Sequence, residues 1–240
     1  MRIYILLSLF LIQGASALSQ STSIYLLGKF SPADDARFVK LTKQHASGGA
    51  LSAYLRSETV EAFGEMKKAA QVDGFDLKII SATRNFERQK EIWENKWNGK
   101  TPVEGKDIST LEGAQKAKLI MRYSSMPGTS RHHWGTDIDL NSVEVNYWKT
   151  SAGQKIYEWL KVNAGKFGFC QPYTNKAENN RTGYEEEAWH WSYFPLSGKM
   201  LDDYNKQIRY ADIKGFAGSE YAEAIKVISI YVNGVSCKEN

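Results

Sequence analysis

The 240-residue sequence lacks most features that mark specialised protein classes. It contains only two cysteines, Cys170 and Cys237, and neither lies in a C-x-x-C pattern, so nothing suggests a metal site built on sulfur ligands. The formal net charge is only +4, which argues against a dedicated nucleic-acid binder with a strongly basic face. No internal repeat or low-complexity segment stands out. The remaining composition, 42% hydrophobic and 24% charged, is that of a globular domain.

The sequence also lacks a hydrophobic run long enough to span a bilayer, which needs about 20 residues. A shorter apolar run over residues 3–12 follows Met1 and Arg2 and precedes the small-residue triplet at 15–17 (ASA). This order is typical of a secretory signal peptide. We therefore expect cleavage after Ala17, export to the periplasm or cell envelope, and no membrane span in the mature chain.

Export to an oxidising compartment leaves two alternatives for the cysteine pair. Cys170 and Cys237 can form a disulfide that joins the C-terminal tail to the core, or they can stay as unpaired core residues. The sequence alone leaves both alternatives open.

Hydrophobic periodicity predicts helices around a few short strands. The helical patterns cover residues 52–72, 85–97 and 154–167, and also the tail after Pro195, above all residues 221–232. The strand patterns cover residues 77–80, 137–140 and 189–194. We expect an α+β fold in which a small antiparallel sheet is surrounded by helices, with a helical C-terminal tail.

Two short segments carry the most distinctive chemistry. They are residues 130–139 (SRHHWGTDID) and residues 187–191 (EAWHW). A hydrolytic zinc site needs three nitrogen or oxygen ligands and a fourth position open for water. His132, Asp139 and His190 supply two imidazoles and one carboxylate, so we predict that they bind one zinc ion.

The spacing of these residues requires the chain to bend twice. His132 and Asp139 are seven residues apart, so one regular strand would direct them to opposite faces, and Gly135 can supply the turn that lets them converge. The tryptophans on either side of His190 would face the core and direct the histidine to the metal. Glu187 is an odd step from His190, so a second bend is needed for it to act as general base on the bound water.

The pattern S-x-H-x-x-G-x-x-x-D followed by E-x-W-H resembles the zinc D-Ala-D-Ala carboxypeptidases of the VanY type, in peptidase family M15. The wider group includes D-Ala-D-Ala dipeptidases, some phage endolysins and the metal-binding core of hedgehog signalling domains. Residues 81–89 (SATRNFERQ) match the family's S-G-Y-R-S-x-x-x-Q segment, and residues 159–169 resemble its W-L-x-x-N-A-x-x-x-G-F helix. The resemblance extends over residues 81–193, roughly half of the chain.

This resemblance implies a role for each matching residue. His132, Asp139 and His190 would be the ligands of Zn²⁺, Glu187 the catalytic base, Arg84 and Gln89 the residues that bind the substrate's terminal carboxylate, and Ser130 a neighbour of the substrate. Because a guanidinium binds a carboxylate at two points, Arg84 would restrict cleavage to a chain end. Glu185 and Glu186 are rivals to Glu187, but only Glu187 has the E-x-W-H spacing. His133 is expected to be structural or to lie at the rim.

Several positions depart from the family pattern. Asp137 stands where the family usually has a small apolar residue, and on a strand it would share the metal-facing side with Asp139. It would either orient a ligand histidine or compete for the metal. Other departures are Thr83 for an aromatic residue, Ala188 for a proline, and Gln171 and Ser192 near positions usually held by arginine.

These observations predict a zinc-dependent D-alanyl-D-alanine carboxypeptidase that acts on peptidoglycan stem peptides and is a monomer. The expected parts are a signal peptide (1–17), an N-terminal extension with the first helix (18–75), a zinc peptidase core (76–196) and a helical tail packed on the core (197–240). The alternatives are an L,D-carboxypeptidase, a dipeptidase, a peptidoglycan endopeptidase or a non-catalytic binding module. Glu187 argues against the binding module, which has no need of a base.

Overall fold

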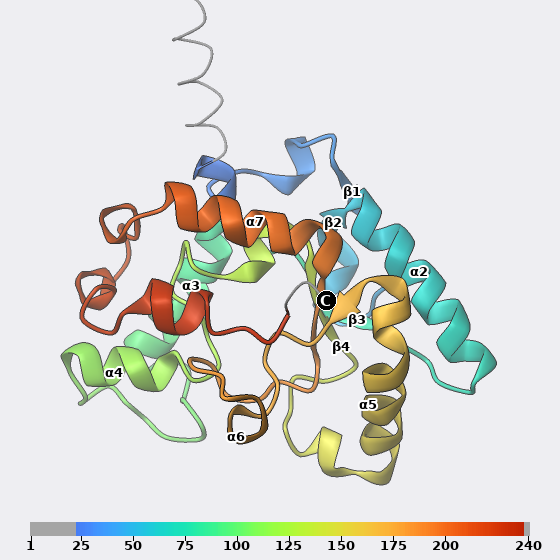
Figure 1. The fold of residues 1–240 in the computed structure, drawn as a ribbon. Helices are drawn as coiled ribbons and strands as arrows, with labels where there is room; N and C mark the ends of the chain where they lie inside the picture. Colours follow the sequence, from blue (N-terminus) through green and yellow to red (C-terminus); the bar gives the residue numbers. More distant parts are fainter. Residues whose placement is uncertain (1–22, 238–240) are drawn as a thin grey trace, which may run out of the picture.

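The computed structural model describes residues 23–237, so the expected signal peptide lies outside the described residues. A hairpin pairs β1 (Phe38–Lys40) with β2 (Tyr54–Arg56). The central antiparallel sheet has the order β3-β4-β6-β5 and consists of β3 (Ile79–Ser81), β4 (Asp137–Leu140), β6 (His190–Tyr193) and β5 (Phe169–Cys170). The helices are α2 (Ser57–Val72), α3 (Phe86–Trp97), α4 (Gly113–Ile120), α5 (Ser151–Asn163), α6 (Lys176–Asn179) and α7 (Phe194–Gln207). This arrangement is the expected α+β fold (Figure 1).

Short helical turns fill many of the connections. They are η1 (Pro32–Asp34), η2 (Gly48–Ser52), η3 (Arg131–Trp134), η4 (Tyr147–Lys149), η5 (Ala164–Phe167), η6 (Tyr210–Asp212), η7 (Ser219–Tyr221) and the π-helical η8 (Val227–Val232). Of these, η3 matters most for the site, because it leads directly into β4.

One face of the central sheet is apolar and is covered by α2 and α5. Ile138 and Leu140 of β4 and Trp191 of β6 join a buried cluster with residues of both helices, such as Phe63 and Leu160. Figure 1 shows α2 and α5 side by side next to β3 and β4. Because side chains alternate along a strand, the same packing directs the other residues of β4 and β6 to the opposite face.

A second buried cluster occupies the other side of the molecule. It combines residues from the N-terminal segment, α3, α4, α7 and the C-terminal segment, among them Leu26, Trp93, Ile120, Tyr204 and Val232. The tail therefore contributes to a core that also contains helices from the middle of the chain. The domain boundaries expected at residues 75/76 and 196/197 stay a prediction.

Some predicted elements match the structure closely, and others are shifted by a few residues. β4 covers residues 137–140 as expected, and Gly168, with φ 79°, ends the helical stretch formed by α5 and η5. The helix predicted from residue 52 begins only at Ser57, because Tyr54–Arg56 pair with β1 instead. Strand β3 lies slightly later than predicted, at Ile79–Ser81.

The predicted helical tail is present as α7 and the π-helical η8, but no continuous helix covers residues 221–232. Helix α7 is present after Tyr193, but the later tail contains only the turns η6 and η7 and the π-helix η8. Lys226 has a positive φ of 53°, which interrupts any regular helix just before η8. The apolar residues that suggested a helix, such as Ile225 and Val227, are buried in the second cluster. Their packing, rather than helical propensity, decides the path of the tail.

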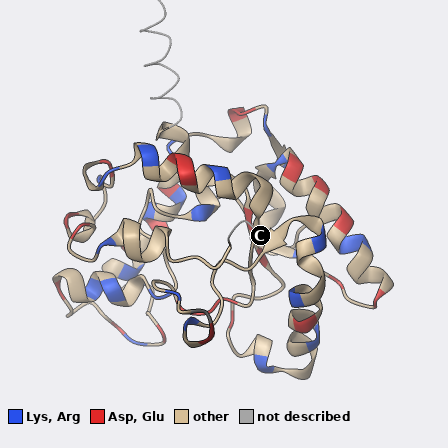
Figure 2. Ribbon diagram, viewed as in Figure 1, with Lys and Arg blue, Asp and Glu red and all other residues tan. Residues whose placement is uncertain are grey.

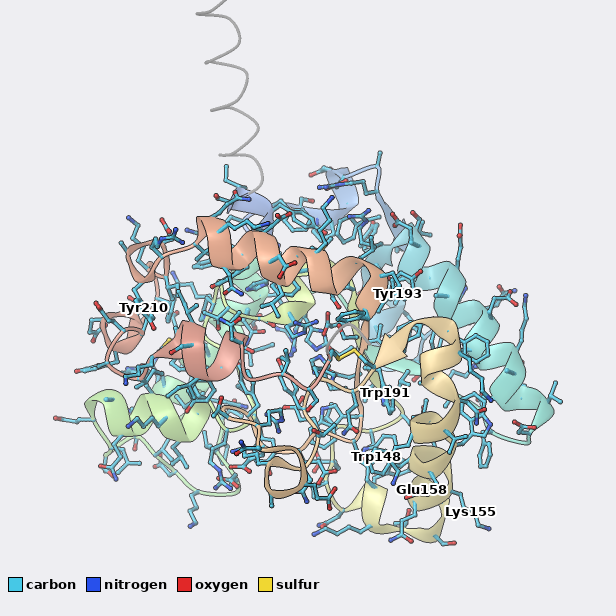
Figure 3. The ribbon with its side chains drawn as sticks, viewed as in Figure 1. Trp148, Lys155, Glu158, Trp191, Tyr193 and Tyr210 are labelled. Atoms are coloured by element: carbon cyan, nitrogen blue, oxygen red, sulfur yellow. A yellow bond between two sulfur atoms is a disulfide. The ribbon has the colours of Figure 1, made fainter. Side chains whose placement is uncertain are left out.

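The tail is also tied covalently to the sheet. Cys170 of β5 and Cys237 form a disulfide, which appears as the yellow bond in Figure 3 and decides between the two alternatives left open by the sequence. The Ser236 amide donates a hydrogen bond to the Pro172 carbonyl at 2.9 Å. Residues 23–237 contain no helix that is both long and apolar enough to cross a membrane. Figure 2 shows basic and acidic residues interspersed along the ribbon, consistent with the small net charge.

Candidate metal centre and substrate cleft

The polar face of β4 and β6 carries the predicted metal ligands. In the antiparallel register Asp139 lies directly opposite His190. His132 comes from η3, and Gly135, with φ 74°, makes the left-handed turn between η3 and β4 that the spacing required. The ligand atoms of the three side chains all lie within 4.8 Å of one another, and all three residues are buried.

The atoms that face the centre of this cluster can be identified from their hydrogen bonds. The Nδ1 atom of His132 lies 2.9 Å from the Ala82 carbonyl, which leaves Nε2 facing Asp139 Oδ1 at 3.4 Å. The Nε2 atom of His190 lies 3.0 Å from Asp137 Oδ1, which leaves Nδ1 facing Asp139 Oδ1 at 3.5 Å. Each ring thus uses one nitrogen for a protein partner and directs the other inward.

The donor set fits a divalent metal ion. His132 Nε2 and Asp139 Oδ1 are buried and have no hydrogen-bond partner among the described residues. Buried polar atoms are rarely left unsatisfied, so a missing ligand is the simplest explanation. Two imidazoles and one carboxylate form the His₂-carboxylate set that zinc uses in hydrolases, with a fourth position left for water.

Glu187 lies at the edge of the cluster. The chain turns over residues 188–189, so that the Glu187 Oε2 atom lies 3.1 Å from His190 Nδ1, as the second expected bend requires. Burial raises the pKa of the Glu187 carboxyl. The two rival carboxylates have other partners: Glu185 pairs with Arg122 and Lys176, and Glu186 accepts a hydrogen bond from Tyr157.

A cleft of about 460 Å³ opens onto this cluster. Its lining includes Asp139, Glu187, Arg84, Lys96, Ser124 and Trp189, together with Ile92, Glu104, Tyr123 and residues 143–146. Arg84 has no ion-pair partner within the described part of the chain, and its Nε atom is buried without a hydrogen-bond partner. A guanidinium in this position can bind a carboxylate beside the metal cluster.

Lys96 is a second cation in the cleft, and sequence reasoning missed it. Its ammonium donates a hydrogen bond to Ser124 Oγ, and no carboxylate within residues 23–237 forms an ion pair with it. Burial and the charge of Arg84 lower the pKa of Lys96. Because Lys96 lies in the last turn of α3, twelve residues beyond Arg84, no local motif could have linked the two.

The other two predicted substrate residues lie beside the cleft rather than in its lining. Gln89 is 1% exposed, and its Nε2 atom donates to the Ser125 carbonyl at 2.8 Å. Ser130 is also buried, and its Oγ atom has no hydrogen-bond partner among the described residues. Neither residue is in the lining given by the described part of the chain, so their contact with substrate stays a prediction.

His133 supports the backbone of the site. Its Nδ1 atom lies 2.6 Å from the Arg84 carbonyl, and its Nε2 atom accepts a hydrogen bond from the Gly128 amide at 2.9 Å. The ring is fully buried, and burial lowers its pKa to about 3, so it stays neutral. Of the two roles considered from the sequence, the structure assigns the structural one.

Asp137 points into a buried polar network behind His190. Its Oδ1 atom accepts from Arg131 Nε at 3.0 Å, and its Oδ2 atom accepts from Thr136 Oγ1 at 2.6 Å. Arg131 also donates to Ser192 Oγ at 2.8 Å. Sequence reasoning did not single out Arg131, because nothing in the sequence shows that η3 folds back over β4 and β6.

The comparisons with known proteins agree with this geometry. The model of the VanY family, described as D-alanyl-D-alanine carboxypeptidase, matches residues 52–196. The chain therefore belongs to the VanY family, the class of carboxypeptidase that the motifs had suggested.

Individual relatives extend the comparison. The D-alanyl-D-alanine carboxypeptidase of Enterococcus faecalis (strain ATCC 700802 / V583) is 31% identical over 126 residues, which are 52% of this chain and 42% of that protein. The chain spans half or less of the length of two of the curated relatives that it matches.

Solved structures share the fold. A crystal structure of a vancomycin resistance D,D-pentapeptidase VanY variant in complex with Zn(II) has a TM-score of 0.50 and 25% identity, with 79% of this chain and 92% of that chain covered. The LdcB LD-carboxypeptidase has a TM-score of 0.51 and 22% identity, with 76% of this chain and 81% of that chain covered, so it shows the fold alone.

Proposed function

We propose that the chain is a zinc-dependent D-alanyl-D-alanine carboxypeptidase that removes the terminal residue of peptidoglycan stem peptides. The observation that carries the proposal is the inward-facing cluster of His132, Asp139 and His190 with Glu187 beside it, at the end of a cleft that also contains Arg84. Family membership and the Zn(II) bound to the VanY relative support the choice of metal and reaction. An enzyme with this substrate acts outside the cytoplasm, in agreement with the expected signal peptide.

The chain's own residues would divide the reaction between them. When bound by His132, Asp139 and His190, zinc supplies the Lewis acidity that polarises the scissile carbonyl and lowers the pKa of water. Glu187 takes a proton from the attacking water and delivers it to the nitrogen of the leaving residue. Its burial favours this role, because burial raises the pKa of the Glu187 carboxyl and makes the carboxylate a stronger base.

Arg84 would select the chain end. Its unpaired guanidinium can hold the free carboxylate of the terminal residue, which places the preceding peptide bond near the metal cluster. An endopeptidase, by contrast, should tolerate loss of this residue. We expect Arg84→Ala to lower kcat/KM on stem pentapeptides by about 10- to 100-fold, because the variant loses the charge-assisted hydrogen bonds to the terminal carboxylate. The same variant assayed on crosslinked peptides separates the two activities: an equal rate of crosslink cleavage would favour the endopeptidase.

The first experiment is product analysis by mass spectrometry. Purified mature protein with zinc is incubated with pentapeptide and tetrapeptide stems, beside a Glu187→Gln control. We expect release of one alanine from the pentapeptide and a fall in kcat of about 10²- to 10⁴-fold in the control, because a general base contributes on that scale. Release from both variants at equal rates would disprove the role of Glu187.

The tetrapeptide tests the second candidate, an L,D-carboxypeptidase. The fold that the chain shares with the LdcB LD-carboxypeptidase motivates this comparison. Release of alanine from the tetrapeptide, and not from the pentapeptide, would replace the D,D-assignment with the L,D-assignment while leaving the metal and base roles intact.

A further inference from the structure

The Asp137 carboxylate is the hydrogen-bond partner of a metal-ligand histidine. Its Oδ1 atom lies 3.0 Å from His190 Nε2, on the side of the ring that faces away from the cluster. The other ring nitrogen, Nδ1, has two possible partners in the absence of metal, Asp139 Oδ1 at 3.5 Å and Glu187 Oε2 at 3.1 Å. Which nitrogen carries the hydrogen therefore determines whether a lone pair is directed at the metal position.

Both oxygens of Asp137 accept hydrogen bonds from neighbouring side chains. Oδ1 receives hydrogen bonds from His190 and Arg131, and Oδ2 receives one from Thr136. The carboxylate is fully buried, and the Arg131 guanidinium lies 3.0 Å from its Oδ1 atom. Both Asp137 oxygens thus already have protein partners.

Arg131 is the ion-pair partner of the buried Asp137 carboxylate. Its guanidinium is 2% exposed, bonds to Asp137 and Ser192, and lies 4.9 Å from the centre of the Trp134 ring. Ser192 in turn donates to Ser197 Oγ at 2.8 Å, at the start of α7. The pair therefore links η3, β4, β6 and α7 in one network behind His190.

We propose that Asp137 is a positioning residue for the metal site. It accepts the Nε2 hydrogen of His190 and so directs the Nδ1 lone pair to the metal, while hydrogen bonds from Arg131 and Thr136 hold the carboxylate in place behind the ring. Of the two roles considered from the sequence, orientation and competition, the geometry assigns orientation. Carboxylate partners of this kind fix the tautomer of a ligand histidine and strengthen its bond to the metal.

The proposal rests on the proposed function only through the identity of the metal, so it is tested with zinc and without a peptide. Removing either charge alone leaves the other buried and unpaired, so Arg131→Met is measured at a temperature below its own melting point, and the double variant removes both charges. The experiment compares the wild type, Arg131→Met, and the double variant Arg131→Met/Asp137→Ala. The readouts are the zinc dissociation constant, from competition with a chelator of known affinity, and the ¹⁵N NMR signals of His190 in the zinc-loaded protein.

The double variant should bind zinc about 10- to 100-fold more weakly than Arg131→Met, which keeps Asp137 and its bond to His190. In the wild type and in Arg131→Met, the NMR signals should show a protonated Nε2 and a metal-bound Nδ1. Thr136→Val is the matched control, because it removes a hydrogen bond to the same carboxylate but leaves the bond to His190. It should lower the melting temperature without changing the zinc dissociation constant by more than about twofold.

Three results would overturn the proposal. Equal zinc affinity of Arg131→Met and the double variant would show that Asp137 does not support the ligand. Tighter binding by the double variant would show competition instead of orientation. Metal bound to Nε2 of His190 would place Asp137 on the wrong side of the ring. Inactivity towards stem peptides, by contrast, would count against the proposed function and leave these measurements unchanged.

Discussion

The two faces of the β4–β6 pair are equally buried but chemically opposite. On one face Ile138, Leu140 and Trp191 are at most 3% exposed, and on the other Asp137, Asp139, His190 and Ser192 are at most 4% exposed. Depth of burial therefore does not distinguish a packing face from a functional face in this protein. The difference lies in what each face needs: the apolar face packs against α2 and α5, whereas each polar atom of the other face needs a directed partner.

The two faces differ in whether their buried groups all have partners within the protein. Apolar side chains are satisfied by any close neighbour of suitable shape, but buried polar atoms need directed partners. On the polar face Asp137 has all its partners, whereas Asp139 Oδ1, together with Nε2 of His132 from η3, has none among the described residues. The polar face is complete only with a ligand, while the apolar face is complete in the protein alone.

Removing zinc should have the largest effect, because it takes away the missing partner of the polar face. A ligand present at 1,000 times its Kd stabilises the folded state by about 4 kcal/mol, so chelation should lower the melting temperature and abolish peptide hydrolysis. Thermal unfolding with and without zinc measures the change. A melting temperature that does not respond to zinc would mean that the cluster binds no metal.

Removing the disulfide tests how much the link between the tail and the edge strand β5 stabilises the protein. Cys170 lies next to Gln171, whose side chain donates to the Glu187 carbonyl at 3.0 Å. The bridge spans 67 residues, so Cys170→Ala/Cys237→Ala should lower the free energy of unfolding by about 4 kcal/mol. Urea denaturation measures the loss, and the variant should no longer respond to reductant. An unchanged urea midpoint would contradict the cross-link.

Truncating a side chain on the apolar side should reduce stability without affecting the chemistry. Leu160 of α5 is fully buried against the sheet, so Leu160→Ala should lower the free energy of unfolding by about 2–5 kcal/mol. Val162 on the same helix is 70% exposed, and Val162→Ala should stay within about 0.5 kcal/mol of wild type. Both variants should keep the wild-type zinc affinity, and a loss of affinity in Leu160→Ala would show that the two faces are coupled.

Lys96 of α3, which lines the cleft, should give the smallest effect. If its unpaired ammonium helps Arg84 attract acidic substrates, Lys96→Met should raise KM by about 10-fold with little change in kcat, whereas exposed Lys100→Met should not. Because the pKa of Lys96 is lowered, its charge is lost at a lower pH than that of a free lysine. The wild-type KM should therefore rise at alkaline pH, and Lys96→Met should lack this rise. A pH profile shared by both proteins would remove Lys96 from substrate binding.

Much of this protein could be predicted where the signal is local. Alternation in residues 137–140 predicted β4, and the motif spacing selected the three residues that the structure brings within 4.8 Å. The tail could not be predicted in the same way. Its apolar residues suggested a helix over 221–232, yet with packing into the second cluster and the break at Lys226 only residues 227–232 form a helix, the π-helix η8.

The amino-acid sequence specifies which residues have the chemistry to bind a metal and which strand positions are apolar or polar. Composition, spacing and alternation are properties of the chain and do not depend on its path. Three contacts become visible only in the tertiary structure. Arg131 forms an ion pair with Asp137, Lys96 and Arg84 line the same cleft, and Cys170 forms a disulfide with Cys237. Each contact depends on how helices and strands pack against one another. A local sequence pattern contains no information on that packing, so these contacts could not be predicted from it.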